Sequence, residues 1–140
     1  MDAKLYLKQV KKLDTKIKNK LIEKQQWRDI ALNITANTNG EKISSSGGSK
    51  SKMANAIEKC VDMESEINSL IDELIDAKSK VIKTIEQLDS ATEYNVLHLR
   101  YIQFYTLQEI ADKYRHEYGW ATTVHGRALK NVQRILNKGD

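Results

Sequence analysis

Two long stretches of the chain repeat apolar side chains at alternating intervals of three and four residues, which places them in one stripe along a helix. The first stretch covers residues 2–35 and the second covers residues 52–88, where the repeat is sustained over more than four heptads. Such a repeat is typical of long helices that pair along a coiled-coil seam. The chain has no proline to interrupt them. We therefore predict an all-α fold built around two long helices.

The two predicted seams differ in how much apolar surface they carry. The first contains Tyr6, Val10, Leu13, Ile17, Trp27, Ala31 and Ile34, with Lys20 and Lys24 as interruptions. The second contains Ile57, Cys60, Glu64, Ile67, Ile71, Leu74, Lys78, Val81, Ile85 and Leu88. Further apolar residues widen the second stripe; they are Met63, Leu70, Ile75 and Ile82. We expect this helix to meet more than one neighbour and the protein to form a homodimer through its long helices.

Residues 36–51, ANTNGEKISSSGGSKS, separate the two stretches and are rich in serine and glycine, so they predict a flexible linker. Residues 1–35 carry nine Lys/Arg and four Asp/Glu, a net charge of +5, whereas residues 52–89 carry five and nine, a net charge of −4. Opposite charge and a flexible connection favour an antiparallel helical hairpin, which we assign to residues 1–89 as an oligomerisation domain.

The last fifty residues predict a different architecture. Ser90 to Glu93 and Thr106 to Glu109 each have the form of a capping box, in which a hydroxyl and a glutamate cap the start of a helix. We predict short helices near residues 91–103, 106–114 and 118–137, forming a separate module over residues 90–140.

The spacing within this module is that of a helix-turn-helix. Ala111 is the small residue needed where two helices cross, and it follows Ile110, which we expect to be buried. Ala121 and Val124 lie ten and thirteen positions after Ala111, where the second helix would bury its first contacts. The alternative is an ordinary three-helix tail with a solvated basic face.

The outer face of the last predicted helix carries candidate DNA-binding residues. Arginine and lysine bind phosphates independently of sequence, and Thr, Tyr and His can bond to base edges. The candidates are Tyr118, Trp120, Thr122, Thr123, His125, Arg127, Lys130 and Arg134, followed by Lys138. Trp120 has a second interpretation, as a core residue packed against Tyr101 or Tyr105.

EYNVLHLRYIQFYTLQEIADKY and the later GRALKNV resemble region four of sigma-70-type factors. The whole chain is similar to ArpU-like late-gene transcriptional regulators of phages and prophages of Gram-positive bacteria, through DMESEIN (62–68), RYI (100–102), EIA (109–111) and HGRAL (125–129). The resemblance implies a sequence-specific DNA-binding regulator that acts with host RNA polymerase, as an activator.

Two residues depart from the family pattern. Arg115 stands where the turn often has glycine, and it would adopt an unfavourable left-handed backbone if the turn kept its usual geometry. Gly119 falls near the start of the last predicted helix, which it would weaken. We therefore expect a longer turn that includes Gly119.

Other classes of function have little support in the sequence. GGSKS (47–51) lacks the preceding strand and the residue order of a phosphate-binding loop, and we find no catalytic constellation, so we expect no enzyme, cofactor or metal. The N-terminus lacks a signal-peptide core and no apolar run could span a membrane, which predicts a cytoplasmic protein. A small terminase subunit that recognises packaging-site DNA and a coiled-coil adaptor for other proteins remain alternatives to the regulator.

Overall fold

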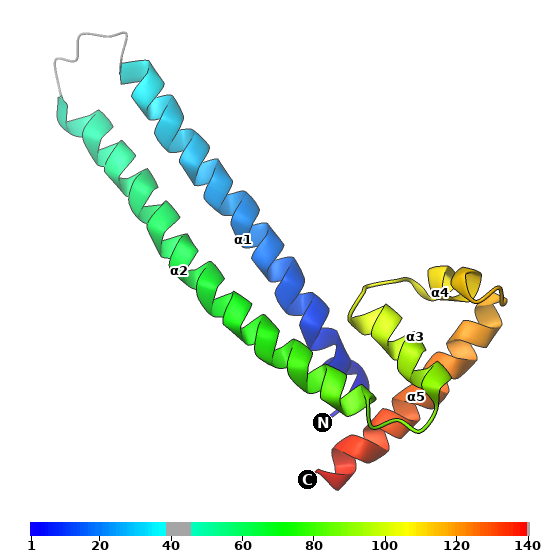
Figure 1. The fold of residues 1–140 in the computed structure, drawn as a ribbon. Helices are drawn as coiled ribbons and strands as arrows, with labels where there is room; N and C mark the ends of the chain where they lie inside the picture. Colours follow the sequence, from blue (N-terminus) through cyan, green and yellow to red (C-terminus); the bar gives the residue numbers. More distant parts are fainter. Residues whose placement is uncertain (39–45, 140) are drawn as a thin grey trace. The chain divides into compact units, whose positions relative to one another are not determined.

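The computed structural model describes residues 1–38 and 46–139, and within these residues all regular structure is helical. Two long helices, α1 (Ala3–Thr38) and α2 (Ser46–Ile85), precede three shorter ones, α3 (Ala91–Tyr101), α4 (Leu107–Lys113) and α5 (Tyr118–Lys138) (Figure 1). The predicted all-α class is confirmed.

The main difference from the predicted helix bounds lies at the start of α2, which begins at Ser46 rather than near residue 52. Serine and glycine are weak helix formers. Once a long helix exists, however, each added residue gains a hydrogen bond without a new nucleation cost, so the helix extends into such a segment. Of the predicted linker 36–51, only residues 39–45 are outside α1 and α2, and they lie outside the described residues.

The chain divides into two compact units. The first, here the core unit, is Met1–Asp14 together with Glu73–Asp140, and the second, here the arm unit, is Thr15–Asp72. The predicted division at residue 89 does not describe this grouping, because the start of α1 and the end of α2 share a unit with the three short helices. The repeat pattern of the long helices gave no sign of that.

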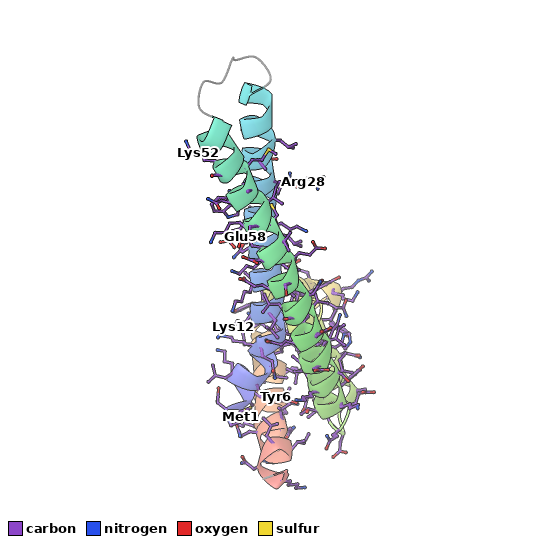
Figure 2. The ribbon with its side chains drawn as sticks, turned by 90° about the vertical axis from the view of Figure 1, so that its left-hand side faces the viewer. Met1, Tyr6, Lys12, Arg28, Lys52 and Glu58 are labelled. Atoms are coloured by element: carbon purple, nitrogen blue, oxygen red, sulfur yellow. The ribbon has the colours of Figure 1, made fainter. Side chains whose placement is uncertain are left out.

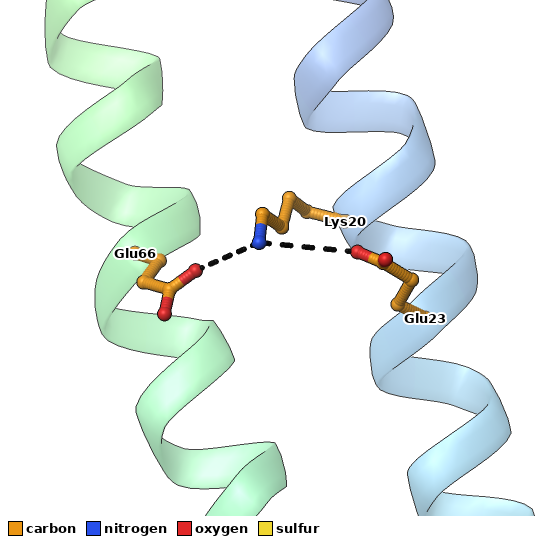
Figure 3. A network of polar contacts seen from close by, with 3 residues as sticks. All are labelled: Lys20, Glu23 and Glu66. Atoms are coloured by element: carbon orange, nitrogen blue, oxygen red, sulfur yellow. Dashed lines mark ion pairs between the residues drawn. The ribbon is translucent and has the colours of Figure 1, made fainter.

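In the arm unit, α1 and α2 run antiparallel and ion pairs join them. The Nζ atom of Lys20 lies 3.0 Å from Oε2 of Glu66 and 4.0 Å from Oε2 of Glu23 (Figure 3). The Nζ atom of Lys24 lies 3.7 Å from Oε2 of Glu64. The hydrogen bond and charge of Glu66 raise the pKa of Lys20. The two lysines that interrupt the predicted seam are therefore the residues that pair across it.

The buried register of α2 differs from the predicted one at four seam positions. The predicted members Ile57, Glu64, Ile71 and Lys78 are exposed, and the residues that precede them, Ala56, Met63, Leu70 and Ala77, are buried. Both sets have helical spacing, but the first contains two charged residues whose burial would cost several kcal/mol, roughly, without a partner in the seam. Cys60, predicted to be a buried apolar residue, is half-buried, and its thiol lies 3.7 Å from the carbonyl oxygen of Lys24. Charged side chains such as Arg28 and Glu58 are exposed on the arm unit (Figure 2).

The core unit encloses one cluster that combines all of its long segments. Leu7 and Val10 of α1 pack with Val81 and Ile85 of α2 against residues of α3 and α5. From α3 the cluster includes Leu97 and Tyr101, and from α5 it includes Ala128 and Val132. Polar contacts join the same elements: the hydroxyls of Tyr6 and Thr84 lie 2.8 Å apart, and the amide of Ala3 donates to Oε1 of Gln133. The first residues of the chain are thus tied to its last helix.

The two predicted capping boxes differ in the structure. At Thr106 both bonds of the box are present, and at Ser90 the hydroxyl accepts a hydrogen bond from the amide of Glu93. The Glu93 side chain instead accepts a hydrogen bond from the Asn131 side chain of α5. Hydrogen bonds from Thr106 to the Glu109 carboxylate lower the pKa of that side chain.

Candidate nucleic-acid interface

The link between α4 and α5 has the hydrogen bonds of a Schellman motif, a common way to end a helix. The amide of His116 donates to the carbonyl of Ala111 (2.8 Å), and the amide of Arg115 donates to that of Asp112 (3.1 Å). Arg115 has a φ of 57°, in the left-handed region that this motif requires. The chain is helical again from Tyr118, where α5 begins.

The expectation of a longer turn containing Gly119 is wrong. Gly119 is the second residue of α5, and a side chain added to it would meet nothing within 4 Å. Arg115 adopts the left-handed conformation in spite of its side chain, at a cost of about 1–2 kcal/mol. The two bonds of the motif and the packing of the helices on either side offset that cost.

The residues predicted to lie at the helix crossing are buried. Ala111 and Ala121 have no exposed surface, and neither does Ile110, while Val124 is 5% exposed. Ile110 and Val124 form a second cluster with Val96 and Leu99 of α3. α4 and α5 contact each other, and the small side chains of the two buried alanines leave room for a close approach.

Trp120 packs against this second cluster, as do Tyr105 and Tyr114. It therefore takes the predicted core role, but its ring partners are His116 and Tyr114, where the sequence analysis had named Tyr101 or Tyr105. Its ring stacks on His116 with centroids 4.2 Å apart, and the ring of Tyr114 lies 5.4 Å away. The indole is half-buried. Trp120 therefore closes the end of the module between the turn and the first residues of α5.

Three further candidates lie at the start of α5. Tyr118 is 51% exposed, and Thr123 is exposed while Thr122 is half-buried. Both threonine hydroxyls donate to the carbonyl oxygen of Gly119, at 2.9 Å for Thr122 and 2.8 Å for Thr123. Each hydroxyl oxygen retains acceptor capacity. The threonines can therefore accept from a base amino group without losing these local bonds.

The His125 side chain contacts Tyr101 within the core unit. Its Nε2 atom lies 2.6 Å from the Tyr101 hydroxyl, and the two rings are stacked with centroids 5.7 Å apart. Burial, and then the positive charges of Arg100 and Lys4, lower the pKa of His125 to about 4. Burial also raises the pKa of Tyr101. At neutral pH His125 is an uncharged partner of a buried tyrosine.

The remaining candidates form one continuous basic face on α5. Arg127, Lys130, Arg134 and Lys138 are exposed and recur at intervals of three, four and four residues, and Thr123 precedes them on the same face. The helix contains no aspartate or glutamate. Its opposite face packs into the core unit through Ala128 and Val132. The basic face is thus the surface that α5 presents outward.

A polar network positions this face, and the sequence analysis did not identify it. Glu93 is 5% exposed, and its Oε1 atom accepts a hydrogen bond of 2.6 Å from the amide nitrogen of Asn131. Asn131 Oδ1 in turn accepts a bond of 3.2 Å from Arg134. The network connects the start of α3 to the basic face. The capping form of residues 90–93 had suggested only a local role for Glu93.

No protein-family model, curated protein or solved structure matches the chain. None of the described helices combines the length and apolar character needed to cross a membrane. Within the same described residues, no group of three His, Cys, Asp or Glu side chains is placed to hold a metal ion.

Proposed function

We propose that the protein is a sequence-specific, double-stranded-DNA-binding transcription regulator of the phage type, in which α4 and α5 form a helix-turn-helix. The observation that carries the proposal is the outer face of α5. It presents Arg127, Lys130 and Arg134 in a row, without a single acidic residue on the helix, and follows a short turn between two helices that each bury an alanine. That is the arrangement by which a helix-turn-helix lays its second helix on DNA.

In this proposal the residues of α5 have three different roles. Arg127, Lys130 and Arg134 contact phosphates, and the Asn131 side chain holds the last of these in place. Tyr118, Thr122 and Thr123, on the first two turns of α5, are the candidates for contacts with base edges. Trp120 and His125 act through the packing of the module rather than by touching DNA, since each is engaged by neighbouring rings.

The resemblance to sigma region four adds a role for host RNA polymerase. EYNVLHLRYIQFYTLQEIADKY and GRALKNV resemble that region, which in sigma factors contacts polymerase as well as promoter DNA. We propose that it activates phage-type genes by binding upstream of the start site and supplying contacts that a weak promoter lacks. A homodimer would place two such modules on two half-sites.

DNA binding is tested by selecting bound duplexes from a random pool and measuring their affinity by fluorescence anisotropy over a range of salt concentrations. Replacing Arg127, Lys130 or Arg134 by Ala should weaken binding to all sequences alike and reduce the salt slope by about one unit per lost contact. Thr122→Ala or Thr123→Ala should change sequence preference, by roughly 1–3 kcal/mol per lost base contact. Arg28→Ala, on the exposed surface of the arm unit, is the matched control. Basic-face variants that bind like the parent would contradict the proposal.

Activation is tested by transcription in vitro from a selected promoter with host polymerase holoenzyme. Stimulation that is lost with Arg127→Ala and kept with Arg28→Ala would support an activator. Specific DNA binding without any effect on transcript, together with stimulated cleavage by a large terminase subunit, would favour the packaging role instead. Absence of salt-sensitive DNA binding would favour the adaptor.

A further inference from the structure

A second heptad stripe runs along α2, beside the one that packs against α1. Its positions are Ile57, Val61, Glu64, Asn68, Ile71 and Ile75, at intervals of four, three, four, three and four residues. At about 100° per residue these side chains fall within a strip about 80° wide. All six are exposed, and the aliphatic ones retain between 38% and 60% of their surface. A strip of branched aliphatic side chains in water marks an interaction surface.

The order of residues in this outer stripe is a chemical palindrome. Read from either end it is aliphatic, aliphatic, polar, polar, aliphatic, aliphatic, with its midpoint at residue 66. A two-fold interface between identical chains requires such a pattern, because residue i of one copy meets residue j of the other and j meets i. An antiparallel pair centred on residue 66 sets Ile57 against Ile75 of the second copy and Val61 against Ile71.

From this we infer that the outer stripe of α2 binds the outer stripe of a second copy of the chain, antiparallel, with the two-fold axis near residue 66. Self-association through this stripe does not depend on DNA binding.

The polar pair at the centre selects this direction and register. Antiparallel pairing sets Glu64, an acceptor, opposite the amide of Asn68 of the second copy. The Glu64 carboxylate is already compensated by Lys24, 3.7 Å away, which lessens the cost of covering it. A parallel pair would set Glu64 against Glu64, and a slip of one heptad would set polar against aliphatic side chains. Single polar positions in a seam specify register in this way.

Charge on the flank of the stripe gives the interface a salt dependence of its own. Glu58 and Asp72 each follow a stripe residue on the side away from the α1 seam, and both are exposed. In an antiparallel two-fold pair the same flank of each copy faces the same side, so these carboxylates come near those of the second copy. Salt screens that repulsion, so the dimer should tighten as salt rises, whereas DNA binding should weaken.

A charge exchange across the interface tests the proposal by sedimentation equilibrium of the full chain. The parent should be a dimer. Val61→Lys or Ile71→Glu should each raise the dimer dissociation constant about tenfold or more, because each buries a charge among aliphatic side chains. The double variant V61K/I71E should recover the dimer, since each Lys then meets a Glu of the other copy, and V61K/I71K should not.

Ile22→Lys is the matched control, because Ile22 is 57% exposed on α1, against 60% for Val61 on α2. It should leave the dimer unchanged, and circular dichroism should show equal helix content in all variants. A monomeric parent, a double variant as weak as the single ones, or an equal effect of Ile22→Lys would overturn the proposal. None of these outcomes bears on whether the basic face binds DNA.

Discussion

The arm unit and the core unit contain parts of the same two helices but bury their side chains to different depths. The largest fully enclosed side chains, among them Leu7, Ile85, Leu97 and Ile110, all lie in the core unit. In the arm unit Ile67 retains 5% exposure, and Leu70 retains 8%. The reason is the number of neighbours. A side chain between two helices always has an open edge, whereas a side chain among three or more can be surrounded.

The two units also differ in how many large apolar side chains remain exposed. Among the described residues, most of the large apolar side chains that remain strongly exposed lie in the arm unit, including Leu21, Ile22, Ile57 and Val61. The core unit uses its apolar residues to hold itself together. The arm unit carries more of them than one partner helix can cover. Five of the six residues of the proposed dimer stripe lie in it, and only Ile75 belongs to the core unit.

The largest expected effect comes from truncating the enclosed core. Ile110→Ala should lower the free energy of unfolding by about 2–5 kcal/mol, because Ile110 is fully buried and its neighbours cannot collapse into the space. Ile67→Ala in the arm unit should cost less, since a cavity at an open seam is relieved by water and side-chain motion. Urea denaturation followed by circular dichroism measures both. Equal losses would show that the two units are packed alike.

The next effect is a pH dependence that belongs to the core unit, which contains all three histidines of the chain. The folded pKa of His125 is about 4, below the unfolded value of roughly 6.5, so the unfolded chain binds more protons between these values. Stability should therefore fall as the pH is lowered from about 6.5 to about 4, on the order of 1–2 kcal/mol after allowance for the half-exposed ring. His125→Gln should flatten this part of the curve. An unchanged slope in His125→Gln would contradict the assignment.

A smaller loss is expected at the start of α4. Thr106→Ala should destabilise the core unit by about 1 kcal/mol, because it removes the hydroxyl that accepts the hydrogen bond of the Glu109 amide. The reciprocal bond is donated by the backbone amide of residue 106 and can still form. Thr106→Ser keeps the hydroxyl and should stay close to the parent. Thermal unfolding distinguishes them. An alanine variant as stable as the serine variant would mean that packing alone holds this helix start.

The smallest effects are two gains in stability around the turn. Gly119→Ala should stabilise by about 0.5–1 kcal/mol, since the position is helical and an added methyl group meets nothing within 4 Å. Arg115→Gly should stabilise by a similar amount, about 1 kcal/mol, by removing left-handed strain. Gly126→Ala, also in α5 with open space, is the control for the helical effect. A loss of stability in Arg115→Gly would show that the arginine side chain contributes more than its backbone costs.

Much of the core unit could be predicted from the sequence because its signals are local. The cap at Thr106, the small residue Ala111 and the spacing to Ala121 and Val124 each act within a few turns of helix. In the structure the cap is present and the three apolar residues are buried. The basic face of α5 could be predicted for the same reason, because helical spacing alone brings its residues together. Whether that face binds DNA is still a prediction.

The sequence by itself determined the helices and their order, since propensity, caps and spacing act over a few residues. It did not give the geometry of the turn, where Arg115 rather than Gly119 takes up the change of direction. Only the tertiary structure decided which of two adjacent stripes on α2 is buried. Ala56 and Ile57 begin stripes that are equally helical, and the choice depends on what α1 offers opposite them. It also decided that His125 and Glu93 face inward. Their partners, Tyr101 and Asn131, are 24 and 38 residues away, and no local pattern carries information over that distance.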